Sequence, residues 1–184
     1  MAVRKRSQGL LASLAVLLID MQPSFLGKIS KKKKVGLVSR QIEVIRECAR
    51  LDVPLIVLEY RNQGDTLIEL MNEVRLVPRN QLIIKLYDDG FEGTDLNRIL
   101  KGFSVKTLVL MGVNASYCVK KTALSAVGLG YKIITGDYLI DNTCRCCRHR
   151  EKDRGWYMTN GVFHEVPTSL PAMLSKRAKV TKQD

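Results

Sequence analysis

The stretch LVLMGVNASYCVKKTALSAVGLGYKIITGDYLI, residues 108–140, contains the strand–helix–strand unit that decides the fold. Its first residues are apolar without interruption, residues 116–130 have helical spacing, and residues 131–137 form a second strand-like run. Runs of this kind are typical of strands buried on both faces of a parallel sheet. Cys118 lies at the start of the helix, where it is either a small buried hydrophobe or a nucleophile.

The same alternation of apolar strands and amphipathic helices runs through the rest of the chain, and it predicts an α/β protein. The expected architecture is a three-layer α/β/α sandwich around a mostly parallel six-stranded sheet. We expect one domain over residues 12–175, between a basic N-terminal arm (1–11) and a basic C-terminal tail (176–184). The predicted strands are 14–20, 53–60, 81–86, 105–113, 131–137 and 162–166, and the predicted helices are 35–52, 66–77, 94–103, 116–130, 143–158 and one at the end of the domain.

Charge and cysteine content limit the functional classes. The 184 residues carry a formal charge of +12, concentrated at the two ends and in the polar segments 28–34 and 145–154. Such clusters attract anions or solubilise a surface. No aromatic residue is interleaved with the four lysines at 31–34, so we do not expect nucleic acid as the partner. An odd number of cysteines, five, favours reduced thiols and a cytoplasmic protein. The apolar run after the basic N-terminus is too short to span a bilayer.

Polar residues follow four of the predicted strands. In an open parallel sheet, ligands bind beyond the carboxyl ends of the strands. Asp20, Lys85, Cys118 and Asp137 occupy such positions. A helix N-terminus and a nearby ammonium group both lower a thiol pKa, so we expect Lys85 to depress the pKa of Cys118. Asp20 then accepts the thiol proton.

Each residue also has a simple structural interpretation. Cys118 is then a core filler, Asp20 caps a helix, and Lys85 pairs with the acids of the adjacent YDDG segment. No G-x-G-x-x-G or Walker A sequence follows the first strand, which weakens dinucleotide binding and phosphoryl transfer as functions.

Three blocks of the sequence resemble the isochorismatase-like cysteine hydrolases, a superfamily that includes nicotinamidases, carbamoylsarcosine amidases and isochorismatases. The blocks are LLIDMQPSF, IIKLYDDGFEGTDL and VLMGVNASYCVKKTALSAVGLGYKIITGD, and the resemblance spans about residues 12–168. It implies a Rossmann-like fold and a catalytic triad of Asp20, Lys85 and Cys118. It also implies a cis peptide bond at Val113–Asn114.

The resemblance carries further expectations about the site. The backbone N–H groups of Asn114 and Cys118 form the oxyanion hole, and Gln22, Phe25, Ser116 and Tyr117 line the substrate pocket. No metal or other cofactor is expected, because the segment EYRNQGDTL lacks the histidines of metal-using nicotinamidases. A homo-oligomer, dimer or tetramer, is expected.

Three functions follow from these expectations. The first is metal-free hydrolysis of an amide or ureide C–N bond through a Cys118 acyl-enzyme. The second is isochorismatase-type vinyl-ether hydrolysis with Asp20 as the acid. The third is a non-catalytic basic binding protein on the same fold. A zinc site in CRCCRHR (144–150), with Cys144, Cys146, Cys147 and His149, is a weak alternative because a second ligand pair at finger-like spacing is missing.

Overall fold

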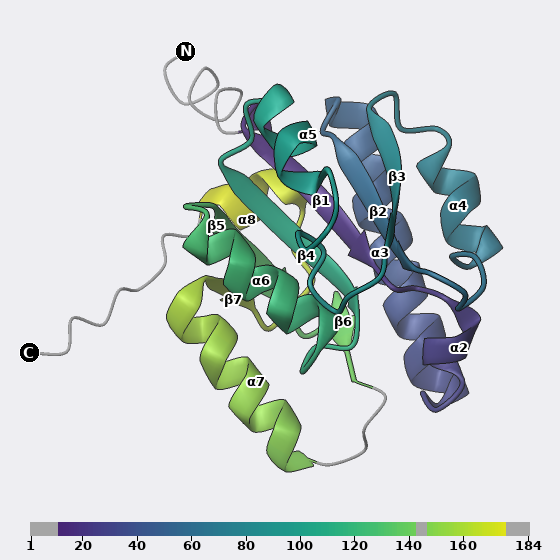
Figure 1. Ribbon diagram of the computed structural model, residues 1–184. Helices are drawn as coiled ribbons and strands as arrows, with labels where there is room; N and C mark the ends of the chain where they lie inside the picture. Colours follow the sequence, from purple (N-terminus) through teal and green to yellow (C-terminus); the bar gives the residue numbers. More distant parts are fainter. Residues whose placement is uncertain (1–10, 143–146, 176–184) are drawn as a thin grey trace, which may run out of the picture.

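A parallel sheet with helices on both faces forms the molecule (Figure 1). The structure, a computed structural model, describes residues 11–142 and 147–175, and only the backbone of 147–150 and 174–175. The strands are β1 (Leu14–Ile19), β2 (Leu55–Tyr60), β3 (Asn80–Lys85), β4 (Thr107–Val113), β5 (Lys132–Gly136), β6 (Ile140–Asp141) and β7 (Val162–His164). The helices are α2 (Pro23–Leu26), α3 (Lys31–Leu51), α4 (Ile68–Val74), α5 (Leu96–Gly102), α6 (Cys118–Gly128), α7 (Cys147–Asn160) and α8 (Leu170–Ser175).

The strand order is β3-β2-β1-β4-β5-β7, with β6 paired to β4, and every pairing is parallel. The chain builds outward from β1 through β2 to β3, and then returns to β4 on the other side of β1. The topological switch point therefore lies between β1 and β4, which is where ligands bind in sheets of this kind. Asp20 and Cys118 follow those two strands.

The central pair of strands, β1 and β4, lies in the middle of the hydrophobic core. All six residues of β1 are fully buried, as are residues 108–111 of β4. The two faces are covered by different helices: α3 and α8 on the far side, and α5 and α6 on the near side (Figure 1). Burial on both faces explains why these strands are apolar throughout.

The predicted α/β/α architecture is confirmed, with two additions. The sheet has a seventh strand, the two-residue β6, and a short helix α2 follows β1. Helix α3 begins at Lys31, earlier than the expected residue 35, because its four lysines continue the helix. In the described part of the chain, no helix is long and apolar enough to cross a membrane. Most of the basic arm (1–10) and the whole tail (176–184) lie outside the described residues.

Candidate active site

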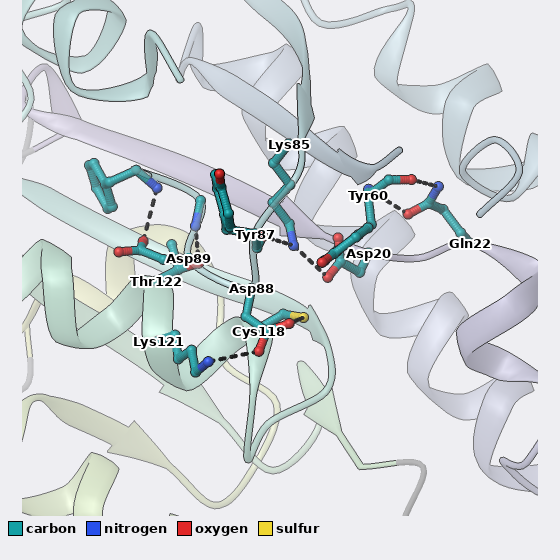
Figure 2. A network of polar contacts seen from close by, with 12 residues as sticks. Asp20, Gln22, Tyr60, Lys85, Tyr87, Asp88, Asp89, Cys118, Lys121 and Thr122 are labelled. Carbon is teal, nitrogen blue, oxygen red and sulfur yellow. Dashed lines mark hydrogen bonds and ion pairs between the residues drawn. The ribbon is translucent and has the colours of Figure 1, made fainter. Parts of the chain in front are cut away.

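A buried ion pair joins Asp20 to Lys85. Asp20 directly follows β1 in a left-handed backbone conformation (φ 52°), and Lys85 is the last residue of β3. Lys85 Nζ donates to Asp20 Oδ2 at 2.9 Å, and both side chains are 0% exposed. The ammonium group also donates to the Tyr87 carbonyl at 3.1 Å and lies 4.5 Å from the centre of the Tyr60 ring. Lys85 therefore reaches Asp20 from two strands away and does not pair with the adjacent acids (Figure 2).

Cys118 is the first residue of α6 and is 3% exposed. Its sulfur lies 3.6 Å from Asp88 Oδ1 (Figure 2). The Cys118 thiol also interacts with Asp20, because it is one of the groups that lower the pKa of that carboxyl. The structure thus brings together the acid, the base and the thiol that the sequence predicted at the ends of β1, β3 and β4.

Burial dominates the electrostatics of the site. Desolvation raises the pKa of Asp20 above its ordinary value, and the charge of Lys85 opposes this only in part. Desolvation also raises the pKa of the Cys118 thiol; the Asp20 charge adds to that rise, and Lys85 lowers it. The prediction of a depressed thiol pKa is therefore wrong for the resting site. The reason is that burial and a carboxylate outweigh one ammonium group.

One oxygen of the Asp20 carboxylate has no hydrogen-bond donor among the described residues. Oδ2 accepts the bond from Lys85, whereas Oδ1 is buried and accepts no hydrogen bond of ordinary length from the described residues. A buried carboxylate oxygen without a donor is a ready acceptor for a proton. Together with its raised pKa, this position suits Asp20 to proton exchange with the neighbouring thiol.

The backbone before Cys118 brings amide groups to the same place. The Val113–Asn114 peptide bond is cis, at the position that the resemblance implied. The N–H groups of Ala115 and Ser116 donate to Asp141 O and Asn142 Oδ1. The Cys118 N–H, at the first position of α6, has no acceptor among the described residues. Such an N–H is a natural donor to an anion.

Gly112 allows β4 to approach β1 just before this turn. A Cβ at this position would lie 2.0 Å from the Ile19 carbonyl oxygen, and the residue has φ +137°, which L side chains rarely adopt. Only glycine fits here. The close contact fixes the end of β4 beside Asp20, which directly follows Ile19.

Two of the predicted pocket residues hold other parts of the chain. Gln22 is fully buried, donates to Tyr60 O at 2.9 Å and to Gly64 O, and accepts from Tyr60 N at 2.8 Å. The Ser116 hydroxyl donates to Asp153. As the structure stands, both side chains are engaged in hydrogen bonds within the chain.

The other two predicted pocket residues are placed differently. Phe25 is half-buried, and its ring meets that of Tyr60 edge to face at 6.0 Å. Phe25 therefore packs on the ring that the Lys85 ammonium group contacts. Tyr117 is 56% exposed and directly precedes Cys118. Tyr117 is therefore accessible to a ligand as the structure stands.

Sequence reasoning missed Asp88 and its partner Lys121. Asp88 Oδ2 forms an ion pair with Lys121 Nζ at 2.9 Å, while Oδ1 faces the Cys118 sulfur. The only sequence signal was the acidic pair in YDDG, which reads equally well as a polar turn. Lys121 lies three residues after Cys118 on α6, so the helical spacing places it on the same side as the thiol.

Asp137 does not join this cluster, although it also follows a strand. It pairs with Arg154 at 3.6 Å instead. No group of three or more histidine, cysteine or acidic residues suited to a metal occurs in the described ranges. Of the proposed zinc cluster, Cys144 and Cys146 and the side chains of Cys147 and His149 lie outside what the structure describes.

Comparisons with known proteins agree with this fold. The nicotinamidase of Staphylococcus aureus superposes with a TM-score of 0.72 at 21% identity, covering 84% of this chain and 99% of that one. The MAR1 ribonuclease of Caenorhabditis elegans gives a TM-score of 0.77 at 17% identity, over 94% of this chain and 86% of that one.

Among curated sequences, the streptothricin hydrolase of Streptomyces noursei is 36% identical over 66 residues, which is 36% of this chain and 24% of that protein. An uncharacterized isochorismatase family protein of Bacillus subtilis, YrdC, is 24% identical over 155 residues, or 78% of this chain and 79% of the relative. Residues 14–149 match the Isochorismatase domain, which is most of the chain. The chain therefore belongs to the isochorismatase family.

Proposed function

We propose that this protein is a metal-free cysteine hydrolase that cleaves an amide or ureide C–N bond of a small molecule. The observation that carries the proposal is the buried Asp20–Lys85 pair, with a free Asp20 oxygen, next to the Cys118 thiol. Family membership, the fold shared with the nicotinamidase and the streptothricin hydrolase relative support a hydrolase.

In the first half-reaction, the Cys118 sulfur attacks the substrate carbonyl as its proton passes to Asp20. The raised pKa of Asp20 makes its carboxylate a better proton acceptor in this step, whereas the raised pKa of the thiol opposes the transfer. The N–H groups of Cys118 and Asn114 stabilise the oxyanion. Asp20 then gives the proton to the leaving nitrogen, and ammonia or an amine departs from the thioester.

In the second half-reaction, water attacks the thioester and gives a proton to Asp20. The acid product leaves, and the returned proton restores the Cys118 thiol. Lys85 holds Asp20 in place through its hydrogen bond to Oδ2. We propose that Phe25 and Tyr117 line the substrate pocket, and that Gln22 and Ser116 shape it through the contacts described above. All protons move between side chains, substrate and water, so the proposal requires no cofactor, and EDTA is expected to leave turnover intact.

Ammonia release across a panel of primary amides and ureides tests this function. We expect turnover of at least one panel member by the wild-type chain and none by Cys118→Ala. Uniform inactivity of the wild type against the panel, together with cleavage of a vinyl ether by the Cys118→Ala chain, would establish the isochorismatase-type alternative, in which Asp20 is the acid.

Self-association is part of the proposal. Edge strand β3 presents Leu82 and Ile84, 51% and 47% exposed, on one face, and Leu86 just beyond the strand continues the row at 47%. An exposed apolar row on an edge strand favours pairing with a second copy. We expect a dimer or larger assembly by light scattering. Leu82→Lys combined with Ile84→Lys is expected to give the monomer, and a monomeric wild type would contradict the proposal.

Nucleic-acid binding is a second candidate, on one specific observation. Helix α3 begins with the four lysines Lys31–Lys34 and has no acid in its first turn. Cations at a helix N-terminus are unfavourable, so a partner that offsets this cost is expected to be an anion. The MAR1 ribonuclease shares the fold. Salt-dependent retention of RNA that is lost when the four lysines become glutamine would support this function, and retention unchanged by the substitution would count against it.

A further inference from the structure

The residue on the open side of Cys118 is Asp88. Of the two carboxylates near the sulfur, Asp20 is 0% exposed, whereas the Asp88 side chain is 33% exposed. Figure 2 shows Asp88 and Lys121 beside Cys118, apart from the Asp20–Lys85 pair. A molecule that approaches the sulfur from solvent therefore meets Asp88 before it meets the buried pair.

The orientation of Asp88 is fixed by its partner. Lys121 occupies Oδ2 at 2.9 Å, which leaves Oδ1 directed at the sulfur at 3.6 Å. Lys121 bonds to Oδ2 and is 55% exposed to solvent, so it offsets the carboxylate's charge at the sulfur only in part, and the Asp88 charge still raises the pKa of the Cys118 thiol. A substrate group next to the scissile bond therefore experiences the negative charge first.

The loop that carries Asp88 is also held rigidly against the nucleophile helix. Gly90 N donates to Thr122 Oγ1 at 2.8 Å, and the Ser125 hydroxyl donates to Asp89. A Cβ on Gly90 would lie 2.5 Å from Leu58 Cδ1 and 3.2 Å from Thr122, so the loop packs against α6 and β2 without a gap. Asp88 and Cys118 consequently keep one relative position, as selection by charge requires.

We propose that Asp88 selects the substrate by charge: it disfavours a carboxylate or other anion beside the scissile carbonyl and accepts a hydrogen bond from an N–H or ammonium group there. The inference rests on the proposed function, since it takes the region around the Cys118 sulfur to be where substrate binds. It narrows the substrate class to neutral or cationic amides and ureides. Asp88 is a specificity-determining residue and takes no proton in the reaction.

Two thiol reagents of opposite charge test this selection on the full chain. Aminoethyl methanethiosulfonate is a cation and sulfonatoethyl methanethiosulfonate an anion, and a thiolate attacks the sulfenyl sulfur of either, forming a mixed disulfide and releasing methanesulfinate. The rates at Cys118 are followed on the tryptic peptide 107–120, which holds no other cysteine. Their ratio cancels the fraction of thiolate, because both reagents attack the same ionised sulfur.

The Asp88→Asn substitution is expected to lower the cation-to-anion rate ratio about tenfold, because it removes one negative charge beside the sulfur. Lys121→Met is expected to raise the ratio. Asp52→Asn is the matched control, because it removes the same charge from a side chain that is 64% exposed and pairs with Arg79. Asp52 precedes β2 and therefore lies near the starts of the strands, whereas Cys118 follows the end of β4. The ratio of Asp52→Asn is expected to stay within about twofold of wild type, since exposed charges more than a Debye length away are screened.

A ratio in Asp88→Asn that matches that of Asp52→Asn overturns the proposal, as does a folded chain in which neither reagent reaches Cys118. If Asp88→Asn fails to fold, Lys121→Met decides alone: a ratio unchanged from wild type overturns the proposal, and an increase supports it. These outcomes do not depend on turnover. Failure of the proposed function would show instead as inactivity of the wild type toward every amide and ureide.

Discussion

Two lysine–aspartate pairs flank the Cys118 sulfur, and they differ in exposure. Asp20–Lys85 and Asp88–Lys121 have the same nitrogen-to-oxygen separation, 2.9 Å, yet the first pair is fully buried and the second is open to solvent. Burial raises the pKa of Asp20, whereas the Lys121 hydrogen bond lowers the pKa of Asp88. The same chemical pair therefore gives a proton acceptor in one environment and a permanent anion in the other.

The difference assigns separate roles to the two carboxylates. A general base needs a pKa that approaches that of the group it deprotonates, and Asp20 is shifted in that direction. Asp88 stays ionised over a wider range of pH, so it is suited to recognition and poorly suited to accepting a proton. Substitutions that convert one environment into the other, or remove one pair at a time, test this division.

The largest contrast is expected in turnover. Asp20→Asn should lower kcat on an accepted amide by about 10²–10⁴, because an amide side chain cannot take the thiol proton. Asp88→Asn, the same change at the exposed pair, should lower kcat on a neutral amide by about tenfold or less. Steady-state kinetics of the two variants on one substrate provides the comparison. Equal losses would remove the distinction between the two carboxylates.

Stability is expected to separate the two lysines. Lys85→Met leaves Asp20 charged and buried without a partner, which should lower the free energy of unfolding by about 3–5 kcal/mol. The double variant Asp20→Asn with Lys85→Met should recover part of that loss, because the unpaired charge is gone. Lys121→Met, at the exposed pair, should unfold at the wild-type urea concentration. An equally mild effect of Lys85→Met would contradict the burial of its pair.

The pH dependence of Cys118 alkylation is expected to follow the raised thiol pKa. Iodoacetamide reacts with the thiolate, so the rate should climb about tenfold per pH unit and reach no plateau below about pH 9. Removing the Asp20 charge in Asp20→Asn stabilises the thiolate and should move the profile to lower pH. Lys85→Met should move it to higher pH. A wild-type plateau at neutral pH would show that the thiol is activated in the resting state.

Cys48 gives the smallest expected signal and serves as an internal reference. It is 0% exposed in α3, and burial raises its pKa without any charged partner opposing the shift. It should remain unlabelled by iodoacetamide in the folded chain and become labelled in urea. Labelling of Cys48 at the rate of Cys118 would indicate that the α3 side of the core opens on the timescale of the reaction.

The fold was predictable because uninterrupted apolar runs indicate where the buried strands lie, even when the conformations of the loops are unknown. The strand ends then located Asp20, Lys85 and Cys118, since parallel strands end at one edge of the sheet. The two-residue β6 was missed because its pairing with Gly112 and Val113 depends on the turn before it. A hydrophobic pattern of that length carries no signal of its own.

The electrostatics of the site were less predictable. Asp88 was missed because its orientation depends on Lys121, 33 residues away along the chain, and on a loop held by α6. The direction of the Cys118 pKa shift was wrong because sequence shows which charges are nearby but not how deeply they are buried. Loop conformation and solvation are properties of the folded chain.

The central claim is that Cys118 forms a covalent acyl-enzyme with Asp20 as the proton carrier. Its most direct test is intact-protein mass spectrometry of turnover mixtures quenched in acid, on an amide that the wild type accepts, with the adduct mapped to peptide 107–120. We expect an adduct equal in mass to the acyl group on wild-type protein, and none on Cys118→Ser, which should bind substrate without turnover. A Cys118→Ser chain that hydrolyses the substrate at the wild-type rate, with no adduct on either protein, would contradict it.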